Sequence, residues 1–469
     1  MLFKHFYDED LAQGSYLIGC QAKGEAIVVD AWRNLQTYLD EAERNNMKIV
    51  AVTETHIHAD YLSGSRELAA MTGAKLYLSD EGNADWKYGF DGIKLYDGDE
   101  IKLGNITVKA MHTPGHTPEH MSFLVTDGAA ASGPGFYLTG DFVFVGDIGR
   151  PDLLDEAAGG IDTRFVGAKL LFASLRDKFL NLPDYVQVWP AHGAGSACGK
   201  ALGAIPSSTV GYERNFSWWA DYVKRGDEAG FTKALLDGQP DAPLYFGRMK
   251  MQNKAGPALL GERPALKTYT ASELQAALDA DNVIFVDTRN RDSYIKNYVE
   301  GSLFVPMGKS FITYASYAID PLTDQRPIVV LAQDEASAEK MRTKMSYVGI
   351  DNVVGYISSL EGLRTSQVKM VSPADLANVK NSYILDVRTA NEYTAGHIQG
   401  ANQLHVGRVV YKQNSLPKDK NLVVHCQAGG RATVAASILR AAGFERVLEL
   451  EGSYAGYESY LKNREVVNA

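Results

Sequence analysis

Two histidines and an aspartate stand close together after an apolar run near the start of the chain. The run 49–52 (Ile-Val-Ala-Val) has the composition of a buried strand. The segment 55–61 follows it and reads Thr-His-Ile-His-Ala-Asp-Tyr. Imidazole and carboxylate groups at this spacing can begin a metal site, because both bind transition metals. The sequence therefore predicts a metal site at the end of this strand.

Three later segments have the same form, an apolar stretch followed by a polar residue. His116 comes after the stretch 106–111, Asp141 after 136–140, and His192 after 185–189. Because strand ends meet in one crevice of an α/β protein, we expect these side chains to converge. Four other histidines are expected to be ordinary surface or core residues, namely His5, His112, His120 and His405.

The order of these motifs resembles the metallo-β-lactamase superfamily over about residues 1–250. Within it, the pattern is similar to glyoxalase II and, more closely, to the persulfide dioxygenases. The resemblance implies an αββα sandwich in which iron is held by His56, His116 and Asp141. It further implies three residues that orient the ligands and nearby waters without binding the metal, His58, Asp60 and His192.

The end of the first motif decides how many metal ions to expect. In the superfamily a histidine at this position normally helps to hold a second metal, and here the residue is Tyr61. Phenol is a poor ligand at neutral pH, because it keeps its proton. We therefore expect one Fe(II) per chain, with Zn as a mis-incorporated metal, and room beside the iron for O₂ and substrate.

Two residues near the predicted ligands are candidates for contact with the substrate. Arg150 matches the Gly-Arg-x-Asp of the dioxygenases, and its guanidinium suits a carboxylate or persulfide anion. The alternative for Arg150 is a surface arginine that caps Asp152. Cys198 is placed near the site entrance, where Lys200 is close enough in sequence to lower the thiol pKa. The alternative for Cys198 is a small packing residue.

A second motif, His-Cys-Gln-Ala-Gly-Gly-Arg, occupies residues 425–431 behind another apolar run. Such a loop at the start of a helix points backbone N–H groups at the sulfur of Cys426, which favours thiolate and a bound persulfide. Arg431 adds a fixed positive charge. The spacing Cys-x₄-Arg resembles the rhodanese sulfurtransferases and is shorter than the Cys-x₅-Arg of tyrosine phosphatases. The resemblance implies that Cys426 and Arg431 are catalytic.

The second half of the chain contains an internal repeat. Asp287 aligns with Asp386 at the end of one apolar run, and Ala332 aligns with Cys426 at the end of the next. The first copy therefore lacks the sulfur nucleophile. It also has an acidic residue, Asp334, in the segment that corresponds to the glycine-rich loop of the second copy. We expect a pseudo-rhodanese domain with a structural or docking role.

These features predict a multidomain α/β protein of three domains, with a boundary in the stretch 248–257. The expected order is a metallo-β-lactamase αββα sandwich and two rhodanese-like α/β domains with parallel sheets. Their predicted bounds are 1–255, 265–365 and 371–469.

Composition limits the partners. The chain has 469 residues and a net charge of −10, and no basic block suggests nucleic-acid binding. No apolar run is long enough to span a bilayer, and the first residues lack the features of a signal peptide. Three cysteines fit a reducing compartment better than a disulfide framework. We expect a cytoplasmic homo-oligomer without nucleic-acid or membrane partners.

The motif order resembles the persulfide dioxygenase–rhodanese fusions of bacterial sulfide detoxification. The resemblance implies that a low-molecular-weight thiol persulfide and O₂ give sulfite and thiol at Fe(II). Cys426 would then exchange sulfane sulfur among thiol, sulfite and thiosulfate. Two alternatives stay open: a glyoxalase II-like thioester hydrolase with two zinc ions, and a non-enzymatic module for sulfur relay or sensing.

Overall fold

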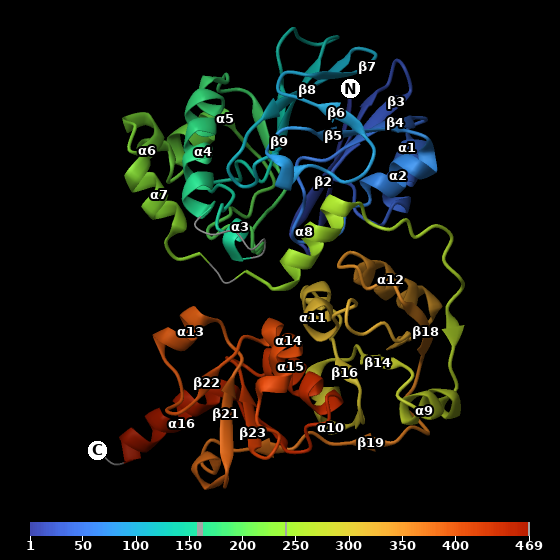
Figure 1. The fold of residues 1–469 in the computed structure, drawn as a ribbon, viewed down its shortest axis with the longest axis vertical. Coiled ribbons are helices and arrows are strands. Elements are labelled where there is room, and N and C mark those ends of the chain that lie inside the picture. Colours follow the sequence, from blue (N-terminus) through green and yellow to red (C-terminus); the bar gives the residue numbers. More distant parts are fainter. Residues whose placement is uncertain (157–162, 240–241, 468–469) are drawn as a thin grey trace. The chain divides into compact units, whose positions relative to one another are not determined.

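The computed structural model describes residues 1–156, 163–239 and 242–467 and divides into two compact units, Met1–Gly261 and Glu262–Ala469 (Figure 1). The boundary predicted at 248–257 begins inside helix α8 (Tyr245–Ala255). The amide of Asn253 on this helix donates to the backbone carbonyls of His58 and Tyr61 over 2.8 and 2.7 Å. Helix α8 therefore packs directly on the predicted metal-binding segment.

The first unit contains two six-stranded sheets. The first has the order β1-β2-β3-β4-β5-β6, with bounds Leu2–Asp8, Gln13–Cys20, Glu25–Val29, Lys48–Thr53, Lys75–Ser79 and Ile93–Leu95. The second has the order β12-β11-β10-β9-β8-β7, with bounds Ser208–Thr209, Gln187–Pro190, Phe136–Gly140, Met121–Asp127, Ile106–His112 and Glu100–Leu103.

Alternation along the strands creates the layers of this unit. On β2, Tyr16 and Ile18 enter the apolar core between the two sheets, whereas Leu17 enters a core with helices α1 and α2. The second sheet likewise packs its outer face on α4 to α7, around buried Leu171 and Trp219. The predicted αββα sandwich is thus confirmed, and its inner strands are apolar on both faces because both faces are covered.

The helices of the first unit lie outside this pair of sheets. Their bounds are α1 Gln36–Arg44, α2 Ser65–Thr72, η1 Ala84–Trp86, α3 Leu153–Glu156, α4 Thr163–Asp177, η2 Phe179–Asn181, α5 Val210–Phe216, α6 Ala220–Arg225 and α7 Glu228–Leu236.

The second unit contains two five-stranded sheets with the same topology. The first is ordered β13-β18-β17-β14-β16, with bounds Lys267–Thr268, Val353–Ile357, Ile328–Leu331, Ile284–Asp287 and Leu303–Phe304. The second is ordered β20-β24-β23-β21-β22, with bounds Met370–Val371, Val447–Leu450, Asn421–His425, Ser382–Asp386 and Asn402–Gln403. The neighbouring strands in both sheets run parallel, as predicted. A small ribbon pairs β15 (Tyr298–Val299) with β19 (Thr365–Ser366).

The internal repeat is visible in the elements that follow the strands. Strands β17 and β23 are each followed by a twelve-residue helix, α12 (Glu335–Ser346) and α15 (Gly430–Ala441). The other helices of this unit are α9 Ala271–Asp279, α10 Arg291–Lys296, α11 Phe311–Ala318, η3 Leu376–Asn378, α13 Ala390–Ala395, η4 Val406–Arg408, α14 Val409–Lys412, η5 Gln413–Ser415 and α16 Ser453–Val467. Because each copy has its own sheet and apolar core, we propose that 265–365 and 371–469 are separate domains.

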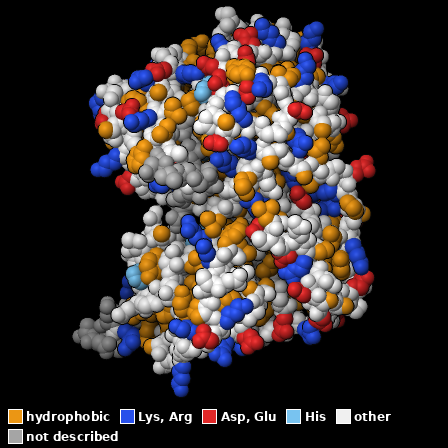
Figure 2. Space-filling model, in the orientation of Figure 1, with side chains coloured by type: hydrophobic (Ala, Val, Ile, Leu, Met, Phe, Trp, Pro, Cys, Tyr) orange, Lys and Arg blue, Asp and Glu red, His pale blue; other side chains and the backbone are white. Residues whose placement is uncertain are grey.

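The surface of the protein is mixed in character. Acidic and basic side chains are interspersed on the face shown in Figure 2. Within residues 1–156, 163–239 and 242–467, every helix is too short or too polar to cross a bilayer.

Candidate functional site

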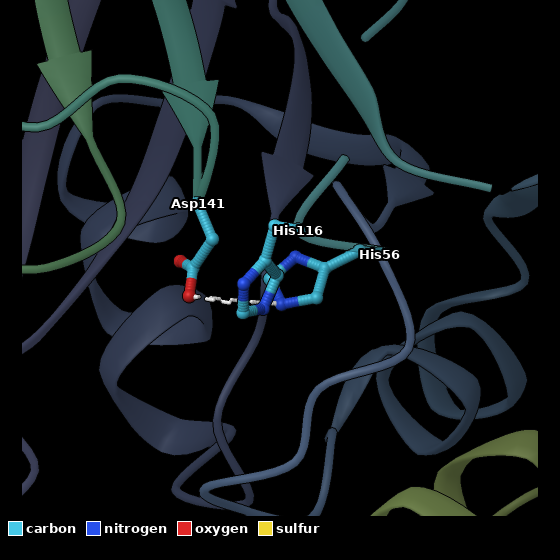
Figure 3. Close-up of side chains that lie close together, drawn as sticks. All are labelled: His56, His116 and Asp141. Atoms are coloured by element: carbon cyan, nitrogen blue, oxygen red, sulfur yellow. Dashed lines mark ion pairs between the residues drawn. The ribbon is translucent and has the colours of Figure 1, made fainter. Parts of the chain in front are cut away.

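The three predicted ligands come together at the ends of strands in the first unit. His56 follows β4, His116 lies between β8 and β9, and Asp141 follows β10. Figure 3 shows their side chains turned toward one point, and one ligand atom of each lies within 4.8 Å of the others. The carboxylate Oδ2 of Asp141 is 3.4 Å from Nε2 of His116 and 4.0 Å from Nε2 of His56. All three residues are buried.

The charges and hydrogen bonds of this cluster fit a metal ion. Both carboxylate oxygens of Asp141 are buried, and neither has a hydrogen-bond partner among the described residues. A buried carboxylate without a partner is costly, so a cation at this point would stabilise it. Burial lowers the pKa of His56 and of His116, and neighbouring imidazoles lower that of His56 further. Neutral imidazole is the form that binds a metal.

Backbone and hydroxyl groups orient the two imidazoles. Nδ1 of His116 donates to the carbonyl of Arg150 over 2.9 Å, which leaves Nε2 facing Asp141. Nδ1 of His56 lies 2.9 Å from the hydroxyl of Thr55. Such contacts fix the tautomer and the direction of a ligating histidine.

His58 lies beside the cluster, with its ring 4.2 Å from that of His56, and its Nε2 faces Asp30, a residue that the sequence motifs did not point to. Its Nε2 lies 3.1 Å from Oδ1 of Asp30, and both side chains are fully buried. Burial opposes the charged form of His58, but Asp30 outweighs it and raises the pKa of His58 to about 9. Asp30 also accepts from the backbone and hydroxyl of Thr55. A signal did exist, because Asp30 follows the apolar strand β3 directly.

Tyr61 fills space behind His58 and does not face the ligands. Its ring lies 4.6 Å from the ring of His58, and its hydroxyl donates to the carbonyl of Asp30 over 3.3 Å. The side chain is fully buried, and burial raises its pKa well above the ordinary value. The phenol therefore keeps its proton, and its ring packs against that of His58.

A second cluster lies next to the first and consists of Asp60, His192 and Cys198. Nε2 of His192 is 3.5 Å from Oδ2 of Asp60 and 3.5 Å from Oδ1 of Asp141, so this imidazole joins the two clusters. Its Nδ1 donates to the carbonyl of Ala12 over 3.0 Å. Burial raises the pKa of Asp60, although His192 opposes the shift. The sequence predicted positions beside the metal for Asp60 and His192, but not their grouping with a cysteine.

The predicted effect of Lys200 on Cys198 is wrong. Cys198 is buried, and burial together with the charges of Asp141 and Asp60 raises its pKa well above the ordinary value. The ammonium of Lys200 instead donates to the carbonyls of Ala234 and Asp237. The sequence predicts Cys198 near the site entrance, whereas the structure places it inside the second cluster as a buried thiol with carboxylates as neighbours.

Arg150 is buried and fully engaged with protein groups. Its Nε and one terminal nitrogen donate to the two oxygens of Asp152 over 2.8 and 2.5 Å, and the other terminal nitrogen donates to the carbonyl of Ala197 over 3.2 Å. The predicted alternative, a cap on Asp152, describes these contacts, although the side chain is buried and not on the surface. A substrate anion would have to compete with Asp152 for this guanidinium.

His120, expected to be an ordinary residue, supports a ligand. Its Nε2 accepts a hydrogen bond from the backbone amide of Asp141 over 3.1 Å, and its ring stacks on that of His56 at 5.2 Å. Gly140 makes this approach possible, because a β-carbon there would lie 2.6 Å from Nε2 of His120. The other three histidines expected to be ordinary, His5, His112 and His405, make ring or local backbone contacts.

The cysteine loop of the second unit leads into a helix, as predicted, and one backbone N–H donates to its sulfur. Cys426 follows β23 and is buried, and the backbone amide of Gly429 donates to its sulfur over 3.1 Å. Gly429 has φ +106°, a conformation that favours glycine. Arg431, on the first turn of α15, pairs through both terminal nitrogens with Glu392, each over 2.7 Å. The positive charge predicted at Arg431 is therefore partly neutralised by the carboxylate of Glu392.

In the first copy, the carboxylate of Asp334 occupies the N-terminus of the helix that follows the corresponding loop. Asp334 caps α12 and accepts a hydrogen bond from the backbone amide of Ser337 over 2.8 Å. Ala332 stands where the second copy has its sulfur, and a cavity of about 980 Å³ lies beside it. The start of α12 thus already holds a carboxylate from the same chain.

Comparison with protein families divides the chain in the same order. The metallo-β-lactamase superfamily matches residues 9–192, and the rhodanese-like domain matches residues 270–364 and 372–460. A solved structure of a metallo-β-lactamase from Staphylococcus aureus is 36% identical, with a TM-score of 0.65, and the match covers 76% of this chain and 98% of that one.

The chain is also similar, over less than half of its length, to two curated proteins that differ in activity. The mitochondrial persulfide dioxygenase of Homo sapiens is 26% identical over 196 residues, 41% of this chain and 68% of that protein. The hydroxyacylglutathione hydrolase of Hyphomonas neptunium is 27% identical over 223 residues, 47% of this chain and 77% of that protein.

Proposed function

The chain belongs to the metallo-β-lactamase superfamily and carries two rhodanese-like domains, and we propose that it is a non-haem Fe(II) persulfide dioxygenase coupled to a sulfurtransferase. The observation that carries this proposal is the buried cluster of two neutral imidazoles and one carboxylate, His56, His116 and Asp141. The match to a persulfide dioxygenase supports it.

In the proposed reaction a low-molecular-weight thiol persulfide, O₂ and water give the thiol, sulfite and two protons. The outer sulfur is oxidised by four electrons, and O₂ is reduced by the same four. Two imidazoles and one carboxylate suit Fe(II), which when bound supplies open positions for O₂ and sulfur. The buried walls of the cluster keep bulk water away from these positions. His120 and the carbonyl of Arg150 hold Asp141 and His116 in place.

The proposed second reaction takes place at Cys426. Its thiolate attacks the outer sulfur of thiosulfate, a sulfur–sulfur bond forms, and sulfite leaves with the electrons of the broken bond. The amide of Gly429 stabilises negative charge on the Cys426 sulfur before the attack. The same step in reverse would make thiosulfate from sulfite and the Cys426 persulfide.

Two variants test the two halves separately. Purified protein loaded with Fe(II) should consume O₂ on addition of glutathione persulfide and should transfer sulfur from thiosulfate to cyanide. Asp141→Ala should abolish O₂ uptake and leave sulfur transfer intact. Cys426→Ser should do the reverse, so each variant is the control for the other. O₂ uptake that survives in Asp141→Ala would refute the assignment of the metal site.

The cluster of Asp60, His192 and Cys198 favours one alternative, a hydrolase with two metal ions. The match to a hydroxyacylglutathione hydrolase accords with it. The two functions differ in metal content and in their use of O₂. Two zinc ions per chain, thioester hydrolysis and no O₂ uptake would establish the hydrolase, whereas one iron per chain with O₂ uptake would establish the dioxygenase.

A further inference from the structure

The first rhodanese copy, which lacks a cysteine at Ala332, lies against the sulfur loop of the second copy. Its helix α11 packs on α15 and on η4 of the second copy, and Figure 1 shows α11 next to α14 and α15. Helix α15 begins directly after the loop that holds Cys426. Side chains of the first copy can therefore reach the sulfur site.

Tyr314 on α11 is the side chain that faces this loop. A β-carbon built on Gly430, the first residue of α15, would lie 3.8 Å from the Tyr314 hydroxyl. Gly430 follows the amide that donates to the sulfur of Cys426. The hydroxyl thus lies next to the residue at which the loop meets α15, and Tyr314 is half-buried.

Burial is the main reason that Tyr314 keeps its proton. Burial and then the negative charge of Cys426 raise the Tyr314 pKa, while Arg431 and a hydrogen bond with the Ser310 side chain oppose the shift. A phenol that keeps its proton can donate a hydrogen bond to an anion at the sulfur. Arg431 is already paired with Glu392, so a neutral donor from the first copy would add to the cradle.

A second side chain of the first copy, Arg291, contacts the residues around the cysteine loop. The guanidinium of Arg291 lies 2.8 Å from the position of a β-carbon on Gly429, donates to the hydroxyl of Thr433 over 2.8 Å, and pairs with the buried carboxylate of Glu449 at 3.3 Å. The shape of the cysteine loop therefore depends on both copies.

We propose that the first copy completes the sulfur site of the second, with the hydroxyl of Tyr314 donating a hydrogen bond to the sulfur anion held at Cys426. The inference rests on the proposed sulfurtransferase function. The bound anion is thiosulfate before transfer and the Cys426 persulfide afterwards. The new bond joins the sulfur of Cys426 to the outer sulfur, sulfite leaves with the electron pair, and Tyr314 retains its proton throughout.

The test uses the full chain and thiosulfate-to-cyanide transfer. Tyr314→Phe removes one donor to a charged group, so KM for thiosulfate should rise roughly ten- to hundredfold, with a smaller change in kcat. Tyr317→Phe is the matched control, because Tyr317 lies on the same helix but packs on His405 and Gly407. O₂ uptake with glutathione persulfide should be the same in both variants.

The possible outcomes distinguish a failure of this inference from a failure of the proposed sulfurtransferase function. Absence of transfer in the wild type would refute the sulfurtransferase itself. Transfer in the wild type with an unchanged KM in Tyr314→Phe would overturn the inference alone. Equal losses in both tyrosine variants would also overturn it, because they would show that α11 acts by packing. Circular dichroism and the thermal unfolding midpoint verify that each variant is folded.

Discussion

The backbone amide of Asp141 donates a hydrogen bond to Nε2 of His120 over 3.1 Å. His120 must therefore carry its proton on Nδ1, which donates to the hydroxyl of Thr113 over 2.9 Å. This arrangement ties the backbone of Asp141, whose carboxylate belongs to the candidate metal cluster, to a histidine outside the group of three predicted ligands. Contacts of this kind tune a metal site without taking part in it.

The contact predicts the behaviour of His120→Phe. Phenylalanine keeps a ring against His56 but removes the acceptor for the Asp141 amide, so the affinity for metal should fall by roughly ten- to a hundredfold. Competition with a chelator of known affinity measures this change. His112→Phe is the control, since His112 is a half-buried histidine that contacts the carbonyl of Pro118. Equal affinities in the two variants would contradict the prediction.

Gly140 predicts a second effect at the same contact. A β-carbon there would meet Nε2 of His120 at 2.6 Å and Cβ of Thr55 at 2.8 Å, and the backbone has φ +53°. Gly140→Ala should lower the free energy of unfolding by about 1–3 kcal/mol from backbone strain, and should also lower metal content because His120 must move. Gly146→Ala controls for strain alone, because Gly146 has φ +77° and, within the described chain, no heavy atom within 4 Å of the added carbon. Metal content that stays equal to that of Gly146→Ala would count against the argument.

The Asp334 carboxylate at the start of α12 predicts that a cysteine at position 332 does not by itself give the first copy sulfurtransferase activity. In a Cys426→Ser background, Ala332→Cys should give no thiosulfate-to-cyanide transfer above that background. The reason is that Asp334 already accepts from the amide of Ser337 at the start of α12 and would repel an anionic substrate. Transfer that returns with Ala332→Cys would show that the acid does not block the site.

The pair of Glu392 and Arg431 predicts a pH dependence in the second copy. The contact with Arg431 lowers the pKa of Glu392 to about 2, against an ordinary value of 4.5. The stability from this pair is therefore fully present above pH 4.5 and is lost as the pH falls toward 2. Glu392→Gln should speed hydrogen exchange of helix α13 relative to wild type at pH 6, and the ratio of the two rates should fall steadily as the pH drops below 4.5 and approach one only below pH 2. A ratio that does not change with pH would contradict this assignment.

Much of the candidate site could be predicted because its signals are local. His56, His116 and Asp141 each follow an apolar run, and the structure ends a strand just before each of those segments. Strand ends in a covered sheet meet at one edge, so the convergence of the three follows from pattern alone. The repeat was equally visible, since Ala332 and Cys426 occupy equivalent places in two sheets of the same topology.

The strands, the order of the domains, the ligand candidates and the missing cysteine at Ala332 can be read from the order of residues along the chain. The electrostatics around these residues depend on how the strands and loops pack together. Lys200 is two positions from Cys198 but donates to backbone carbonyls elsewhere, while burial and Asp141, which follows strand β10, raise the thiol pKa. The tendency to form a strand depends on residues that are close together in the sequence. Burial and Coulomb interactions depend on distances in space, and these distances are fixed only when the sheets pack.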